Sequence, residues 1–292
     1  MKVLILGAGG MLGHTMLRLF LDTPGLEARG TVRSEHARDV LPADLVPAVT
    51  SCVDLADPDR VVDIMALERP EVVINCAGLV KQREAAADPL AALPVNALLP
   101  HRLAQLCRIA GARLVQFSTD CVFDGVRGRY TESDVAAPVD LYGRAKLLGE
   151  VDAPQAITLR TSMIGPELSV HRGLLDWFLA QTGAIRGYRK AIFSGLTTFE
   201  VATVLRDRVL TRPDLHGVYH MGGEAISKFD LLTLIGGVYG HDVRIEPDDS
   251  LVLDRSLDSS QFRAATGYVP PSWPQMILDM RDLTRGLPVQ SQ

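Results

Sequence analysis

The chain begins with a short apolar run that ends in three regularly spaced glycines, and this start limits the possible folds more than any other stretch. Residues 2–6 are typical of a strand that is buried on both faces of a parallel sheet. Gly7, Gly10 and Gly13 follow, and residues 14–21 have the apolar periodicity of a helix. Such glycines allow a tight turn, close approach of backbone amides to a pyrophosphate, and close packing of the helix on the sheet. The sequence therefore predicts a dinucleotide-binding turn in an α/β fold.

Strand-like runs alternate with helix-like ones through the first half of the chain. Further strands are predicted at residues 27–32, 48–53, 71–75, 113–117 and 156–160. This alternation is typical of a doubly wound parallel sheet with helices on both faces. We therefore expect a Rossmann-type, doubly wound parallel sheet in residues 1–162, together with residues 188–222. Residues 163–187 and 223–292, where the alternation loosens, are expected to form a smaller α/β substrate-binding lobe.

The ends of the second and third strands bear on which cofactor the turn would hold. At the second strand end, a carboxylate would bind the ribose hydroxyls of NAD, whereas Arg33 suits the 2′-phosphate of NADP. NADPH is therefore favoured, with NADH as the alternative, although a surface arginine in a loop would explain Arg33 as well. Asp54, after the third strand, could reach an adenine amine or cap a turn.

The chain contains two asparagines, and each lies at a position where its side-chain amide is expected to have a hydrogen-bond partner. Asn75 ends the fourth strand, facing the expected cofactor, and small residues follow it at Ala77 and Gly78. Asn96 lies in an otherwise apolar helical stretch, where asparagine is a poor choice unless its amide has a partner. A capping role near Pro94 is the alternative for Asn96.

A tyrosine and a lysine four residues apart supply the candidate chemistry. Tyr142 and Lys146 share one face of a predicted helix. An ammonium beside a phenol stabilises the phenolate and is expected to lower the pKa of the tyrosine, which suits a general acid or base. Ser118 and Thr119 end the fifth strand, at the edge where ligands bind in open α/β sheets. A partly solvated helix face without a role is the alternative for the pair.

Composition excludes several other classes of protein. The formal net charge is −5 and no basic block is present, so nucleic acid is not an expected partner. No apolar run is long enough to span a membrane, and no signal peptide is expected before Gly7. The four cysteines have no metal-ligand spacing, so we expect no metal site, core thiols and a cytoplasmic location.

Four motifs together resemble those of the extended short-chain dehydrogenases/reductases, and within them the dTDP-4-dehydrorhamnose reductase group of sugar-nucleotide proteins. The motifs are residues 7–13, 117–125, 142–150 and 159–162. The resemblance implies that Thr119 would bind the substrate oxygen, Tyr142 would exchange the proton, and Lys146 would hold the nicotinamide ribose. It implies a cofactor site of Gly7, Gly10, Met11, Leu12, Gly13, Arg33, Asp54, Leu55, Asn75, Ala77, Gly78, Asn96, Ser118, Lys146 and Thr161. It implies a substrate site of Val80, Asp120, Val122 and Arg255.

For Arg255, a structural ion pair with Asp254 or Asp258 is the alternative to a contact with the substrate diphosphate. The group commonly has tyrosine where this chain has Cys121, which could reshape the sugar pocket. The related dehydratases have Asp-Glu after the threonine. Because Cys121 follows Asp120 here, the acid for water elimination is missing.

The expected function is NADPH-dependent reduction of a nucleotide-linked 4-keto-6-deoxysugar. A non-catalytic cofactor-binding subunit, resembling the regulatory subunit of methionine adenosyltransferase, and a nucleotide-sugar epimerase are the alternatives. The family resemblance also suggests a homodimer.

Overall fold

The computed structural model describes residues 1–80, 87–168 and 173–284, and in these residues its centre is one seven-stranded parallel sheet. The strands are ordered β3-β2-β1-β4-β5-β6-β11. Their bounds are β1 (Lys2–Leu6), β2 (Glu27–Thr31), β3 (Val49–Thr50), β4 (Val72–Asn75), β5 (Arg113–Thr119), β6 (Ala156–Thr161) and β11 (Gly217–His220). The first six follow the order of a Rossmann sheet, with the topological switch between β1 and β4. The predicted doubly wound α/β fold is confirmed.

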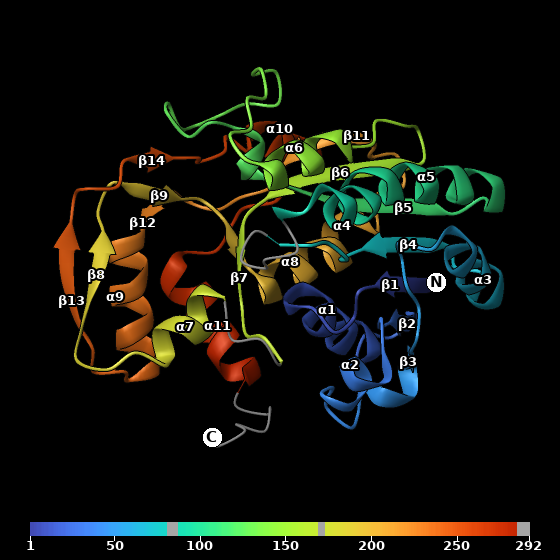
Figure 1. The fold of residues 1–292 in the computed structure, drawn as a ribbon, viewed down its shortest axis with the longest axis horizontal. Coiled ribbons are helices and arrows are strands. Elements are labelled where there is room, and N and C mark those ends of the chain that lie inside the picture. Colours follow the sequence, from blue (N-terminus) through green and yellow to red (C-terminus); the bar gives the residue numbers. More distant parts are fainter. Residues whose placement is uncertain (81–86, 169–172, 285–292) are drawn as a thin grey trace.

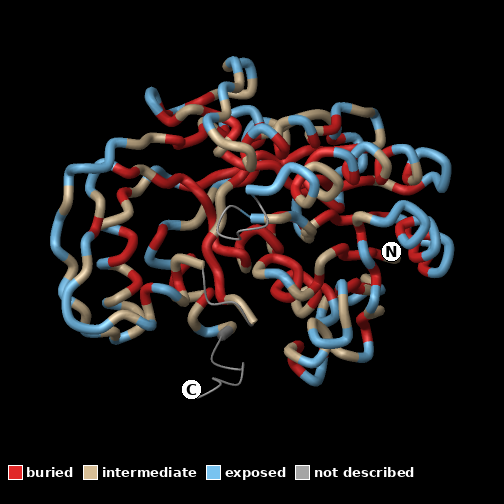
Figure 2. The backbone as a smooth tube through the Cα atoms, in the orientation of Figure 1, coloured by how far each residue is buried: buried red, intermediate tan, exposed pale blue. Residues whose placement is uncertain are grey.

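Helices cover both faces of this sheet, and the alternation of side chains along β1 explains why. Val3 and Ile5 belong to a core shared with α1 (Met11–Leu21) and α8 (Thr198–Val204). Leu4 and Leu6 belong to a second core, shared with α3 (Pro58–Glu68) and α5 (Leu99–Ala110). A strand with four consecutive apolar residues, Val3 to Leu6, can pack against two such cores. In Figure 2 long buried stretches run through the middle of the molecule, where the central strands of this sheet lie.

A smaller lobe packs beside the sheet, at the left of Figure 1. Its strands are β8 (Ala184–Tyr188) with β13 (Arg244–Asp248), and β9 (Ala191–Phe193) with β12 (Ile226–Ser227) and β14 (Leu253–Asp254). Its helices are α7 (Leu174–Leu179), α9 (Lys228–Tyr239) and α11 (Trp273–Thr284). Phe178 and Leu231 of this lobe are buried in the same core as Val3 and Ile5 of the sheet.

Three of the remaining helices lie between consecutive strands of the large sheet: α2 (Glu35–Asp39), α4 (Pro89–Leu93) and α6 (Leu141–Leu148). The others are α10 (Ser260–Thr266), after β14, and the short parallel pair β7 (Met163–Ile164) and β10 (Leu196–Thr197). Residues 188–222, which we grouped with the Rossmann part, contribute β11 to the large sheet and β9 to the lobe. The exact domain division stays a prediction.

Several elements differ from the sequence-based expectation. The apolar helical stretch that contains Asn96 begins with a π-helical turn at Pro94–Leu98 and continues as α5. β8, α2 and α10 were not predicted, because they are short and have mixed polarity. Residues 285–292 lie outside the described part of the chain.

Two expectations about composition can be compared with the structure. Within the described residues, no helix has the length and apolarity needed to cross a membrane. All four cysteines are free thiols, but only Cys107 is buried and Cys52 is exposed. The expectation of four core thiols is therefore wrong for Cys52, whose backbone has a positive φ of 61° in the loop after β3.

Candidate active site

The three N-terminal glycines make the tight turn that the sequence predicts. Gly7 has a φ of 84°, and the amide of Gly10 donates to the carbonyl of Gly7 at 3.0 Å. A Cβ on Gly13 would lie 2.2 Å from that same carbonyl oxygen, so only glycine allows α1 to start so close to the turn. The amino end of α1 consequently sits against the carboxyl end of β1, as a pyrophosphate site requires.

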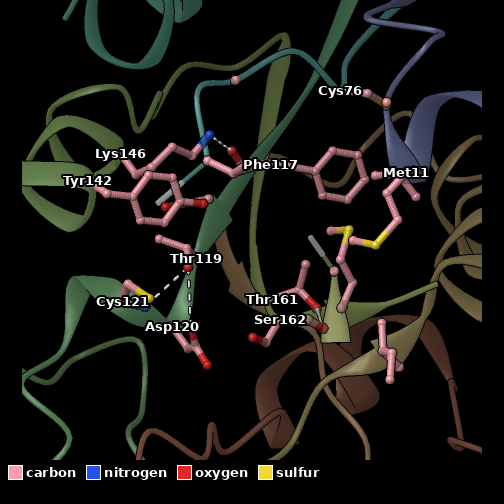
Figure 3. Close-up of a pocket in the computed structure, with 18 of the residues that line it drawn as sticks. Met11, Cys76, Phe117, Thr119, Asp120, Cys121, Tyr142, Lys146, Thr161 and Ser162 are labelled. Carbon is pink, nitrogen blue, oxygen red and sulfur yellow. Dashed lines mark hydrogen bonds between the residues drawn. The ribbon is translucent and has the colours of Figure 1, made fainter. Parts of the chain in front are cut away.

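A cavity of about 370 Å³ lies over the carboxyl ends of the central strands. Its wall is formed by the glycine turn, the ends of β4, β5 and β6, helix α6, and residues of the smaller lobe (Figure 3). Thirteen of the residues predicted for the site line it: Gly10, Met11, Leu12, Asn75, Ala77, Gly78, Val80, Ser118, Thr119, Asp120, Tyr142, Lys146 and Thr161.

The candidate catalytic side chains come from β5 and α6. Thr119 is the last residue of β5, and Asp140 caps α6 by accepting from the amide of Gly143 at 2.8 Å. This places Tyr142 in the first turn of α6 and Lys146 one turn later. In Figure 3 the Tyr142 ring lies between Lys146 and Thr119, and all three reach the same cavity.

The electrostatics of this pair differ from the expectation. Burial raises the pKa of the Tyr142 phenol above its ordinary value, and a hydrogen bond with Thr119 acts in the opposite direction. Lys146 instead directs its ammonium to the carbonyl oxygen of Phe117, at 2.6 Å. The expectation that Lys146 lowers the pKa of Tyr142 is therefore wrong for this arrangement, because burial dominates and the ammonium is directed to Phe117. Burial also lowers the pKa of Lys146 to about 8.

The turn after Thr119 orients its hydroxyl group. Thr119 Oγ1 lies 3.2 Å from Asp120 Oδ1, to which it can donate, and it accepts from the Cys121 amide at 3.2 Å. Burial raises the pKa of the Cys121 thiol to about 11, so the thiol stays protonated near neutral pH. Cys121 also lines the cavity, in agreement with an effect on its shape.

A buried ionic network links the carboxyl ends of β5 and β6. Glu150 accepts two hydrogen bonds from Arg160, each at 2.8 Å, and one from the Ser118 hydroxyl at 2.6 Å. His220 follows, with Nε2 3.2 Å from Arg160 and Nδ1 2.9 Å from the carbonyl of Tyr130. Burial lowers the pKa of His220, so the imidazole is neutral and can accept from the guanidinium. Ser118 is thus fixed in place by Glu150.

Eight of the predicted site residues do not line the cavity. Gly7 and Gly13 shape the turn beneath it, and Leu55 and Val122 are buried in hydrophobic clusters. Asp54 accepts from the Ala56 amide at 3.1 Å, which is the turn-capping alternative. Arg33 is exposed after β2, and its guanidinium bonds to no described residue. The cofactor contacts predicted for Asp54 and Arg33 stay predictions.

The two other residues outside the cavity, Asn96 and Arg255, form hydrogen bonds within the protein. Asn96 bonds the backbone of Leu79 in both directions, at 3.0 and 2.9 Å, so it holds the loop after β4 and caps nothing. Arg255 donates to the Phe123 carbonyl at 3.0 Å and to Cys121 Sγ at 3.4 Å. No ion pair of Arg255 with Asp254 or Asp258 occurs in the described residues, so that alternative is wrong.

Sequence reasoning missed the part of the wall that comes from residues 162–164, 167–168 and 173–174 and from the smaller lobe, including Phe193 and Lys228. One signal was available for Lys228. It is the first residue of α9, after the capping Ser227. A cation is disfavoured at the amino end of a helix, so a lysine there calls for an explanation.

Comparison with known proteins gives matches that cover the first half of the chain and the residues of this site. The family model described as "RmlD substrate binding domain" matches residues 1–168. A dTDP-4-dehydrorhamnose reductase from Streptomyces griseus is 38% identical over 148 residues, which is 50% of this chain and 43% of that protein. The chain thus spans less than half the length of that relative.

Solved structures resemble the chain over nearly its whole length. A dTDP-4-dehydrorhamnose reductase from Clostridium acetobutylicum covers 98% of this chain, and all of that chain is matched, with a TM-score of 0.80 and 23% identity. One from Bacillus anthracis, in complex with NADP, covers 97% of this chain and 99% of its own, with a TM-score of 0.79 and 22% identity.

At these low identities, the similarity to solved structures shows the fold alone. The family model shows to which protein family the chain belongs. The model covers more than half of the chain, including the glycine turn and the residues Thr119, Tyr142 and Lys146. The chain therefore belongs to the RmlD substrate binding domain family, within the dTDP-4-dehydrorhamnose reductase-like branch of the extended short-chain dehydrogenases/reductases.

Proposed function

We propose that this protein is an NADPH-dependent reductase of a nucleotide-linked 4-keto-6-deoxysugar. The observation that carries the proposal is that Thr119, Tyr142 and Lys146 line one cavity with the glycine turn. A hydroxyl donor, a phenol and an ammonium beside a dinucleotide site form the set that carbonyl reduction requires. The names of the relatives point to the same reaction.

The residues present fit a nicotinamide dinucleotide. A Cβ at Gly13 would strike the Gly7 carbonyl, and one at Gly7 would lie 3.0 Å from the Ala77 backbone, so this turn is kept clear of side chains. Met11 and Leu12 would lie along the pyrophosphate, Asn75, Ala77 and Gly78 along the dinucleotide, and Lys146 and Thr161 at the nicotinamide end. When bound, NADPH would supply the hydride.

The chain's own residues would then handle the carbonyl oxygen. Thr119 donates a hydrogen bond to that oxygen and orients the carbonyl over the cavity. Tyr142 delivers the phenolic proton as negative charge develops on the oxygen. Its raised pKa keeps the phenol protonated before the reaction, which is the form a general acid needs. Lys146, which lines the same cavity, would hold the nicotinamide ribose so that the hydride faces the carbonyl carbon.

A direct test combines turnover with one substitution. Purified protein should oxidise NADPH when supplied with a nucleotide-linked 4-keto-6-deoxysugar, and Tyr142→Phe should lower kcat by about 100-fold or more. The NADPH affinity and the melting temperature of the variant should match those of the wild type. Unchanged turnover in the variant would refute the assigned mechanism.

The choice of cofactor has a separate test in Arg33. Arg33→Ala should raise the KM for NADPH by about tenfold, because a charge-assisted contact with the 2′-phosphate is lost. The KM for NADH should change by less than about twofold. Equal effects on both cofactors would assign Arg33 to the surface of the protein alone.

Two alternatives have distinct signatures. An epimerase would retain nicotinamide through purification and interconvert sugar nucleotides without net oxidation of NADPH. A regulatory subunit would capture a stoichiometric partner enzyme and turn over no sugar nucleotide. A cytoplasmic location and a homodimeric state complete the proposal, and cell fractionation and light scattering would test them.

A further inference from the structure

Lys228 is a charged side chain that the proposed reaction leaves unused. It lines the same cavity as Thr119, Asp120 and Tyr142, but it comes from the smaller lobe, as the first residue of α9. Its ammonium lies 4.0 Å from the centre of the Phe193 ring. No described residue accepts a hydrogen bond from it or forms an ion pair with it.

Such an ammonium is costly unless something binds to it. Burial lowers the pKa of Lys228 to about 8, while the carboxylate of Asp120 acts in the opposite direction. The amino end of α9 also disfavours a cation at this position. The Phe193 ring recovers part of the cost through a cation–π contact, but a ring face replaces none of the conventional acceptors that the three N–H donors can use. An apolar side chain would fill the space at lower cost, so packing does not explain the lysine.

The surroundings indicate which ligand would satisfy it. The carboxylate that acts most strongly on the Lys228 ammonium is that of Asp120, the residue after Thr119 in the chain. A phosphate placed against Lys228 would share the cavity with the Asp120 carboxylate, and the two negative charges would repel each other. A neutral hydroxyl can accept from the ammonium and donate to the carboxylate, which suits both groups.

We infer that Lys228, together with Asp120, binds a hydroxyl group of the sugar ring next to the carbon that is reduced. The inference rests on the proposed function, since Thr119 and Tyr142 define where the reacting carbonyl sits. Lys228 is thereby a residue for recognising the sugar, contributed by the lobe, and it contacts neither the cofactor nor the diphosphate. It accounts for how the lobe takes part in choosing the substrate.

The test compares two ligands on two variants. Calorimetric titration of the NADP-loaded protein would use dTDP-glucose and dTDP, which differ by the sugar and its ester linkage. Lys228→Met should weaken dTDP-glucose binding by about tenfold or more, as expected for a lost hydrogen bond to a charged group, and leave dTDP binding within about twofold. Lys190→Met is the matched control, because Lys190 is exposed and its ammonium lies 3.9 Å from Asp249.

Each outcome has a distinct meaning. Equal weakening of both ligands would place Lys228 at the phosphates and overturn the inference, as would unchanged binding of both. Failure of the wild type to bind either ligand would instead refute the proposed function. If Lys228→Met folds poorly, Lys228→Gln gives the same comparison with a polar side chain that lacks the charge.

Discussion

Lys146 shows at the scale of a single residue how function opposes stability. Its ammonium is buried, and the Phe117 carbonyl that accepts from it also accepts from the Gln116 amide at 2.8 Å. Removing the lysine therefore leaves no orphaned acceptor. Because burial has lowered the pKa of Lys146 to about 8, the folded state binds this proton less well than the unfolded chain does.

Lys146→Met should consequently stabilise the protein while abolishing turnover. At pH 7 we expect a gain of about 1–3 kcal/mol in the free energy of unfolding, the order of magnitude that such a shift implies. The cost of the lysine is complete below pH 8 and disappears as pH rises toward the unfolded value of 10.5. Urea titrations at pH 7 and pH 10 should therefore show a smaller gap between variant and wild type at the higher pH. A variant less stable than the wild type at pH 7 would contradict this reading.

The site residues that sequence could find are those with a local signature. Gly7, Gly13, Thr119 and Tyr142 each stand at a fixed place relative to a strand end or a helix start. Arg255 had no such anchor, and the structure places it against Phe123 and Cys121, away from the cavity. Lys228 was not predicted because its place in the cavity depends on residues that are far away in the sequence, such as Thr119 and Phe193.

At the scale of elements, the approach of α6 to the turn after β5 sets the geometry of the site. A Cβ on Gly143 would lie 2.2 Å from the Cys121 carbonyl oxygen and 2.9 Å from Pro138. Gly143 thus lets α6 lie against residues 120–122, and that contact brings Tyr142 to Thr119. Gly143 has an ordinary helical backbone, so glycine is needed here because any side chain would keep the helix and the turn apart.

Gly143→Ala should therefore push α6 away from the turn. We expect kcat to fall by about tenfold to 100-fold, because a displacement near 1 Å is enough to disturb a catalytic alignment. Steady-state assays with thermal melts would measure this. Gly237→Ala in α9 is the control, since no atom lies within 4 Å of the added Cβ. Gly237→Ala should keep full activity and gain about 0.4–1 kcal/mol. Equal activity in both variants would mean that α6 adapts without cost.

The existence of most elements followed from apolar periodicity, and their ends did not. β5 runs on to Thr119 because its last two residues pair with Arg160 and Thr161 of β6. The π-helical turn at Pro94–Leu98 is likewise not visible in the sequence pattern. Pairing and packing partners decide such boundaries, and they lie far away in the chain.

At the scale of the whole molecule, the lobe and the sheet share one hydrophobic core. Phe178, Leu231 and Phe262 are buried in the same cluster as Val3, Ile5 and Val115. Sequence indicated a change in pattern after residue 162, but it could not show that this core continues across the change. Fold class was therefore predictable, whereas the relation of the two parts was not.

Heating should unfold both parts together. Differential scanning calorimetry is expected to give one transition, with a calorimetric enthalpy equal to the van 't Hoff enthalpy. NADP at 100 times its Kd should stabilise that single transition by about 2.7 kcal/mol. Two resolved peaks, with only one shifted by NADP, would show instead that the lobe unfolds independently.

The path of the chain has a consequence for protein engineering. After β6 the chain enters the lobe, returns through α8 and β11 to complete the sheet, and then leaves again for α9 (Figure 1). The lobe is therefore built from separate segments of the chain, and it cannot be exchanged between relatives as one continuous segment. Redesigning the choice of sugar would have to proceed by individual substitutions on the cavity wall, with the interleaved scaffold left intact.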